Sequence, residues 1–303
     1  QRRPAPAAAP PPALAARVRR LAGADSVPVP GTPVRLHRIG AAAQGIVDSA
    51  RTDSAGAATL AATPDTAALF LLSSRWGGIE YFSTPFRLRP GAPAPAAEVV
   101  VYDTSSSTSV QLVQRHLVVE APGADGARLV REVLMLRNAG DRTRVAPDSL
   151  GGSWWLLLPR GATDVQPGTP DLPPTLFAHR GDTVLVLAPI VPGERELSVA
   201  YTLPALAVPR LEVPLVPAPL AVDVLLAEAA ATVQAPFAIA DSQAFDGRTF
   251  RRWAAPGQAE RLVLAFDGGG WRPPRATAPL LAGAFGVLFA LLLPLLVRRR
   301  RAR

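Results

Sequence analysis

The sequence predicts an all-β protein, built of tandem antiparallel β-sandwich modules and followed by one C-terminal transmembrane α-helix. From about Val27 onward, short apolar runs alternate with turn residues at the spacing of strands in small sandwiches. Residues 195–203 (RELSVAYTL) alternate apolar and polar side chains, as a strand with one buried face does. Residues 280–297 (LLAGAFGVLFALLLPLLV) contain no charged residue. These three patterns determine the predicted architecture.

An extended arm is expected over residues 1–26. Residues 1–12 (QRRPAPAAAPPP) have too little apolar bulk to form a core and should be extended or polyproline-like. Residues 13–24 (ALAARVRRLAGA) could form a short helix, because their larger apolar residues fall on one side of a helix with arginines opposite.

Residues 27–90 are expected to form the first sandwich. Three segments support this: GTPVRLHR (31–38), GIVDSARTDSAG (45–56) and LAATPDTAALFLLSSRWGGIEYFSTPF (60–86). Their most distinctive part is the turn Thr52-Asp53-Ser54-Ala55-Gly56, followed by an aliphatic strand that carries Phe70. Together these segments resemble the carboxypeptidase regulatory-like, transthyretin-like domain. The resemblance implies a non-catalytic module used in adhesion, folding or interaction.

A second sandwich is expected over residues 98–219, after a linker at 91–97 (GAPAPAA). Residues 127–138 (ARLVREVLMLRN) are apolar on both faces and should form a central strand, and residues 138–141 supply a turn. The strand pattern resembles the immunoglobulin-like sandwiches that follow regulatory-like domains in secreted bacterial proteins. Residues 220–270 are either a third small β-module or the closing strands of the second.

The predicted membrane anchor covers residues 271–297. Within it, the 18 uncharged residues 280–297 would rise about 27 Å as a helix, which is close to the roughly 30 Å thickness of the hydrocarbon core of a bilayer. A buried core helix is the alternative, but such a helix rarely ends in four consecutive arginines. Trp271 precedes the span and suits the interfacial aromatic belt.

The charges that follow the span predict its orientation. The tail 298–303 contains Arg298, Arg299, Arg300, Arg301 and Arg303. Because positive charge stays on the cytoplasmic side, the bulk of the chain should be periplasmic, at a bacterial cytoplasmic membrane. The first residue is Gln and the sole methionine is Met135, as expected after removal of a signal peptide or in a truncated chain.

Small residues recur every four positions along one side of the predicted helix: Ala278, Ala282, Gly286 and Ala290. Such a stripe allows another helix to approach closely. Since alanine and glycine are abundant throughout the sequence, composition alone is the other explanation.

Composition excludes several kinds of chemistry. The net charge is +8, but five positive charges lie in the tail, so no nucleic-acid footprint is predicted. The absence of lysine excludes Schiff-base and P-loop chemistry, and the absence of cysteine excludes disulfides, thiolate nucleophiles and cysteine-ligated metals. His37, His116 and His179 each stand alone, which favours partly exposed strand histidines over metal ligands or bases. We therefore expect no catalytic residue, metal or cofactor.

Trp154 and Trp155 are the most conspicuous aromatic pair before the anchor. On a strand, one would enter a core and its neighbour would face outward. The exposed one could also contact a partner or the membrane interface.

The leading functional prediction is a non-catalytic, single-pass scaffold or accessory subunit that braces a larger integral membrane complex in the lipid bilayer. Its layout is similar to that of extrinsic subunits of bacterial respiratory or photosynthetic reaction-centre–antenna assemblies. The alternative is a free-standing surface module that binds carbohydrate, peptide or cell-wall material. A membrane-tethered hydrolase is a third possibility, which the missing motifs disfavour. No small-molecule substrate is expected.

Overall fold

The computed structural model describes residues 13–41, 43–148, 151–168, 174–206, 209–245, 247–256 and 261–266. Within these ranges the chain consists of β-strands and one short 3₁₀ helix, η1 (Pro174–Leu176), so the all-β prediction is confirmed. No helix in the described ranges is long and apolar enough to cross a membrane. The arm 1–12, the predicted anchor 271–297 and the tail 298–303 lie outside the described residues.

The chain divides into two compact units. The first unit comprises residues 1–109, 138–147 and 189–193, and the second comprises residues 110–137, 148–188 and 194–303. The first unit also takes two short loops from later in the sequence. Loop 138–147 bonds to the segment that follows β9, through Thr143 to Asp103 and Val145 to Ser105, and loop 189–193 bonds to loop 138–147 through Ile190 and Arg144.

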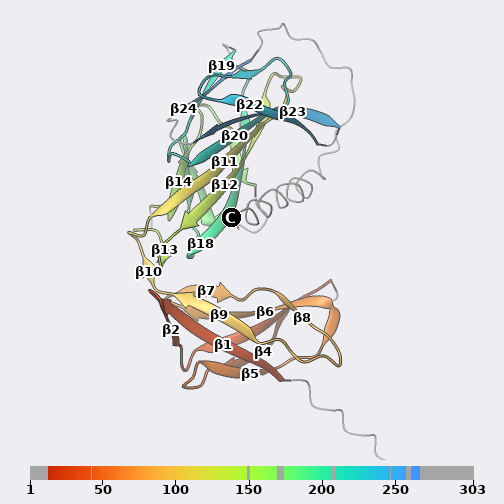
Figure 1. Ribbon diagram of the computed structural model, residues 1–303, viewed down its shortest axis with the longest axis vertical. Helices are drawn as coiled ribbons and strands as arrows, with labels where there is room; N and C mark the ends of the chain where they lie inside the picture. The colour runs from red at the N-terminus through yellow and green to blue at the C-terminus, as the bar shows by residue number, and fades with distance from the viewer. Residues whose placement is uncertain are drawn as a thin grey trace, which may run out of the picture. The chain divides into compact units, whose positions relative to one another are not determined.

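Two sheets form the sandwich of the first unit (Figure 1). One sheet consists of β1 (Ala13–Ala22), β2 (Asp25–Pro28), β5 (Ala57–Ala61) and β9 (Ala97–Tyr102). The other consists of β4 (Gly45–Arg51), β3 (Pro33–Ile39), β6 (Asp65–Trp76) and β7 (Ile79–Phe82), with β8 (Phe86–Leu88) also paired to β6. Apolar side chains from both sheets join in one buried cluster.

Strand β1 corrects the prediction of a short helix at residues 13–24. Leu14, Ala16 and Val18 are at most 1% exposed and alternate with exposed residues, which is the period of a strand. β1 pairs antiparallel with β5 and β2 along one edge and parallel with β9 along the other. The helical pattern fails because strands distant in sequence pair with both edges. The parallel pair also departs from the wholly antiparallel prediction.

The predicted turn at residues 52–56 is confirmed, and it joins β4 of one sheet to β5 of the other. Asp53 Oδ1 accepts hydrogen bonds from the amides of Ala55 (2.8 Å) and Ala57 (2.9 Å). Gly56 has a φ of 71°, and a Cβ there would lie 2.7 Å from the carbonyl oxygen of Val18. Glycine therefore allows this turn to pack directly against β1.

A seven-stranded sheet dominates the second unit. Its order is β15 (Thr163–Pro167), β18 (Gly193–Leu203), β12 (Arg128–Asn138), β11 (Val110–Val119), β20 (Ala221–Leu226), β23 (Arg248–Pro256) and β22 (Ala238–Phe245). β12 is central, as predicted, and β20, β22 and β23 are closing strands of this sheet rather than a separate module. β11 and β20 run parallel, so this unit is not wholly antiparallel either.

Two three-stranded sheets complete the second unit. The first is β14 (Trp154–Leu157), β17 (Thr183–Val186) and β16 (Phe177–Arg180). The second is β19 (Arg210–Pro214), β24 (Arg261–Ala265) and β21 (Thr232–Val233). The guanidinium of Arg128, on β12, lies 4.2 Å from the ring centroid of Phe266, which follows β24, so this small sheet packs on the large one.

A fully buried ion pair lies in the core of the second unit. Arg115 on β11 donates to Glu132 on β12 through Nε (2.6 Å) and Nη2 (2.9 Å), and both side chains are 0% exposed. Arg115 Nη1 also donates to the carbonyl of Pro214 (2.7 Å), and the hydroxyl of Tyr201 on β18 donates to Glu132 Oε1 (2.7 Å). Burial works to lower the pKa of Arg115, but the Glu132 carboxylate reverses this and the pKa is raised, so the guanidinium stays charged. The network thus connects three neighbouring strands and β19.

We expect Glu132→Leu to destabilise the second unit by about 3–5 kcal/mol, because it leaves the Arg115 charge buried without its partner. Denaturant unfolding in mild detergent measures this. The matched control is Glu212→Leu, which breaks the Arg210–Glu212 pair whose side chains are 53% and 54% exposed. Equal losses in the two variants would contradict a special role for the buried pair.

Stability should also fall at alkaline pH through Tyr201. Burial, together with the adjacent Glu132 charge, raises the pKa of Tyr201 well above its usual value of 10.0. Above that pH the unfolded chain loses the phenolic proton while the folded chain retains it, so the free energy of unfolding decreases as pH rises. Tyr201→Phe should flatten this dependence, as measured by denaturant unfolding between neutral pH and pH about 11.

Candidate functional site

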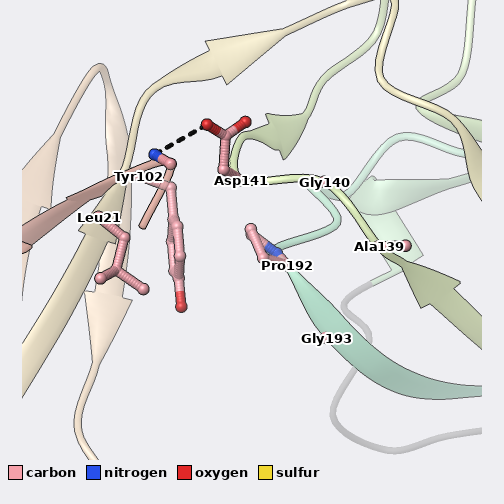
Figure 2. A pocket seen from close by; sticks show the side chains of 8 residues that line it. Leu21, Tyr102, Ala139, Gly140, Asp141, Pro192 and Gly193 are labelled. Carbon is pink, nitrogen blue, oxygen red and sulfur yellow. Dashed lines mark hydrogen bonds between the residues drawn. The ribbon is translucent and has the colours of Figure 1, made fainter. Parts of the chain in front are cut away.

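An open pocket of about 670 Å³ lies on the surface of the first unit (Figure 2). Its volume falls in the range of small-ligand and peptide sites. The lining residues come from the end of β1, the end of β9 and the two loops that the first unit takes from later in the chain: Leu21, Gly23, Tyr102, Ala139, Gly140, Asp141, Pro192 and Gly193.

Strands β1 and β9 supply the apolar wall of this pocket. Leu21 and Tyr102 are directly paired in the parallel register, so their side chains lie side by side. Behind Tyr102, the ring of Tyr81 lies 5.9 Å away at an angle of 51°. The Tyr81 hydroxyl donates to the carbonyl of Tyr102 (3.0 Å) and is hydrogen-bonded to Thr143 Oγ1 (2.8 Å). Partial burial raises the pKa of Tyr102, so its hydroxyl is protonated at neutral pH.

Asn138 fixes the opposite wall, which the two loops form. Its side chain, in a residue only 1% exposed, donates to the carbonyls of Arg142 (2.8 Å) and Ile190 (2.9 Å). Asn138 Oδ1 accepts the amide of Gly140 (3.0 Å). One amide group therefore closes the turn predicted at residues 138–141 and ties it to the second loop.

Short backbone pairings hold both loops to the sandwich. β10 (Thr104–Ser105) pairs with β13 (Thr143–Arg144), and the Thr143 amide donates to the carbonyl of Asp103 (2.8 Å). Arg144 and Ile190 exchange two hydrogen bonds of 2.9 Å each. Loop 138–147 thus pairs with β10, which follows β9, and loop 189–193 pairs with loop 138–147.

Asp141 is the acidic group of the pocket. Its Oδ2 accepts the amide of Gly23 (3.0 Å), and the residue is exposed (Figure 2). Gly23 and Gly193 have φ values of 64° and 106°, and a Cβ at either would meet nothing within 4 Å. The backbone at the rim is therefore uncovered. The pocket combines an aromatic wall, bare backbone and a carboxylate, which suits an apolar group that carries a cation.

A second candidate is the outer face of the β4-β3-β6-β7 sheet, which we define by Ile39, Ile46, Leu69, Leu71 and Phe82. The register pairs His37 with Ile46 and Leu71, Ile39 with Leu69, and Ser73 with Phe82. Directly paired residues project to the same side, so these side chains are neighbours. Ile39, Ile46 and Phe82 are 45%, 57% and 56% exposed. The outer face is therefore a contiguous apolar surface.

His37 lies in the middle of the outer face and is not arranged as a catalytic base. Its Nε2 is 2.8 Å from Ser73 Oγ, and that hydroxyl donates its own proton to Glu80. The imidazole must then donate to Ser73, whereas a base would have to accept the serine proton. Ser73 is also 0% exposed. The chain of bonds positions Glu80 and the His37 ring, which lies 6.2 Å from that of Phe82.

A carboxylate that sequence spacing did not reveal lies beside His116. Asp223 Oδ2 is 3.3 Å from His116 Nδ1 and accepts Gln114 Nε2 (2.8 Å), while Asp223 Oδ1 accepts Arg252 Nη1 (3.2 Å). Burial lowers the pKa of His116, the Asp223 charge opposes this, and Arg252 adds to the lowering. Because three donors converge on Asp223, the group acts as a cross-strand polar network. In the described part of the chain no three His, Cys, Asp or Glu side chains are placed to hold a metal.

The tryptophan pair alternates as expected for a strand. Trp154 is 5% exposed, and Trp155 is 41% exposed and paired with Leu185 on β17. Whether Trp155 contacts a partner stays a prediction. The other predicted positions lie outside the described residues: Trp271, Ala278, Ala282, Gly286, Ala290, Arg298, Arg299, Arg300, Arg301 and Arg303.

Comparisons with known proteins do not assign the chain. No family model matches it, and no curated protein sequence matches it. Among solved structures, an M1 zinc metallopeptidase from Deinococcus radiodurans matches with 13% identity and a TM-score of 0.32, covering 53% of this chain and 43% of that one. A two-domain M1 zinc metallopeptidase mutant bound to L-tryptophan matches with 12% identity and a TM-score of 0.32, covering 55% and 44%. The match thus spans less than half of the metallopeptidase chains, and at that TM-score it supports no assignment.

Asn138→Ala should loosen the pocket loops, because it removes the side-chain hydrogen bonds to the carbonyls of Arg142 and Ile190 and the acceptor of the Gly140 amide. We expect amide hydrogen exchange at residues 140–144 and 190 to accelerate at least about tenfold, while the amides of β3 and β6 keep their protection. Asp125→Ala is the control, since it removes a similar side-chain-to-backbone bond at a turn of the second unit. Unchanged exchange in Asn138→Ala would contradict the role given to this residue.

Proposed function

We propose that this chain is a non-catalytic scaffold or accessory subunit whose first unit binds another protein through the outer face. The observation that carries the proposal is the contiguity of Ile39, Ile46 and Phe82, which the strand register places together with Leu69 and Leu71. Scattered exposed apolar residues are normal on soluble proteins, but a contiguous apolar patch is typical of an interaction site.

The composition of the outer face resembles that of a protein-binding surface. Aliphatic side chains and the Phe82 ring surround His37 on this face, and the ion pair of Arg35 Nη1 with Glu80 Oε1 (3.4 Å) lies at one side. Protein interfaces commonly have an apolar, aromatic centre with a polar rim. The rigid sheet beneath presents these side chains without a cost in backbone ordering.

An integral membrane complex is the partner that we propose. The support is the sequence, in which residues 280–297 are long and apolar enough to span a bilayer and are followed by arginines. Only 13 residues lie between Phe266, the last described residue, and Leu280, so the reach is at most about 50 Å. Such an anchor would hold the second unit close to the membrane surface and tether the whole chain there, which raises the local concentration of membrane partners. A photosynthetic reaction-centre–antenna assembly is one such complex, by similarity of layout.

The alternative function, a free-standing module that binds peptide or carbohydrate, is favoured by one observation. The pocket with Tyr102 and Asp141 has the volume and the convergent polar group of a ligand site.

The double variant Ile46→Ser, Phe82→Ser should lose its membrane-protein partners. We expect recovery of co-purifying proteins in mild detergent, quantified by mass spectrometry, to fall about tenfold, because Ile46 and Phe82 are the most exposed apolar residues of the outer face and a few such residues supply most of an interface's binding energy. Ile239→Ser is the matched control, since Ile239 on β22 of the second unit is 64% exposed. Equal recovery of co-purifying proteins with the double variant and with Ile239→Ser would contradict the proposal. So would the absence of any co-purifying membrane protein with the unaltered chain.

A further inference from the structure

We propose that the pocket of the first unit binds an arginine-bearing, proline-rich segment, and that residues 1–12 of a second copy of this chain supply it. This inference does not depend on the function proposed for the outer face, because the two sites share no residue.

The apolar walls of the pocket suit proline. Tyr102, Leu21 and Pro192 line the pocket, with Leu21 on one side of the tyrosine ring and Pro192 on the other (Figure 2). Polyproline II segments are commonly recognised by aromatic-lined grooves, since their fixed backbone loses little entropy on binding. The sequence QRRPAPAAAPPP (1–12) is expected to favour this conformation.

The carboxylate of Asp141 suits the two arginines that precede the first proline of this segment. A guanidinium can form paired, charge-assisted hydrogen bonds with a carboxylate. Arg2 and Arg3 stand directly before Pro4. A segment whose prolines pack on Tyr102 therefore brings a positive charge next to the pocket and its Asp141 carboxylate. No acidic residue occurs in residues 1–12, so the charges of segment and pocket are complementary.

The bare glycine backbone at the rim suits an extended peptide. Residues in polyproline II conformation make no internal backbone hydrogen bonds, so their carbonyls remain available. Because Gly23 and Gly193 have no side chain, a peptide backbone can approach theirs closely.

Chain geometry favours a second copy as the source of the segment. Asp141 contacts Gly23, which follows the far end of β1, and the strand itself spans about 33 Å from Ala13. Arg3 precedes Ala13 by ten residues, a reach of about 31 Å in polyproline II conformation. Folding back within one chain would therefore need the whole segment fully extended along β1, whose two edges are already paired. The segment of another copy has no such constraint, and the resulting contact is head-to-tail.

The test uses the full-length chain in mild detergent as receptor, with Arg2→Gln and Arg3→Gln so that its own segment does not compete. A fluorescently labelled peptide QRRPAPAAAPPP is titrated and its anisotropy is recorded. We expect saturable binding that weakens with added salt. Asp141→Asn in the receptor should weaken it about tenfold or more. Asparagine still offers an oxygen to the Gly23 amide, so the fold is retained. Tyr102→Leu should also weaken binding, through loss of the ring face.

Two controls accompany these measurements. Asp182→Asn changes an exposed aspartate outside the pocket and should leave binding unchanged. A peptide with glutamine at both arginine positions should bind at least about tenfold more weakly. Absence of saturable binding, or binding that is insensitive to both Asp141→Asn and Tyr102→Leu, would overturn the proposed site.

Sedimentation velocity of the full-length chain tests the second copy as the source. The unaltered chain should show concentration-dependent association that is reduced by Arg2→Gln with Arg3→Gln and, separately, by Asp141→Asn. Association through the predicted membrane helix would be the same in all three proteins. Identical distributions in the three would overturn the head-to-tail contact. Phe82→Ser, a variant of the outer face, should leave peptide binding intact. This result would show that the pocket and the outer face act independently.

Discussion

Pairing of β1 along both edges is the constraint on which the first unit depends. Its antiparallel contacts with β2 and β5 and its parallel contact with β9 close one sheet of the sandwich, and its inward residues fill the core. The same register sets Leu21 beside Tyr102, so the pocket wall follows directly from it. Gly56 completes the arrangement, because only a residue without Cβ can pass so close to the carbonyl of Val18. The half of β1 that carries Arg19 and Arg20 is thus held by β2, which follows it directly, and by β9, which begins about 75 residues later.

Much of the strand content was predictable, because alternation requires only local sequence. In residues 195–203 the inward set was predicted correctly, and Leu197, Val199, Tyr201 and Leu203 are at most 3% exposed. The prediction that the other face lies in water is wrong at Ser198 and Ala200, which are 9% and 5% exposed. At Ser198, Gly168 bonds to the carbonyl and lies against the side chain. Residues 13–24 were misassigned for a different reason. The spacing of Leu14, Val18 and Leu21 fits a helix, whereas the spacing of Leu14, Ala16 and Val18 fits a strand. Local sequence cannot distinguish the two patterns, because the strands that pair with this segment lie far away in the sequence.

The sites were less predictable than the fold. Sequence indicated the turn at residues 138–141, but Leu21, Tyr102, Asp141 and Pro192 converge only after the sandwich closes. The outer face has a partial signal, since alternate residues of β3 are Arg35, His37 and Ile39, yet the register with β4 and β7 is what makes it contiguous. The buried partner of Arg115 is also invisible to sequence, because any of the acidic residues on neighbouring strands could have faced it.

Site-specific photocrosslinking in the native membrane tests the central claim, that the outer face is where a membrane protein docks. A benzophenone amino acid placed at Phe82 reports on contacts of that side chain, and one placed at Ile239 reports on an equally exposed apolar position of the second unit. The account predicts a discrete crosslinked adduct with an integral membrane protein from position 82 and none from position 239. Adducts of equal yield from the two positions, or no protein adduct from position 82, would contradict it.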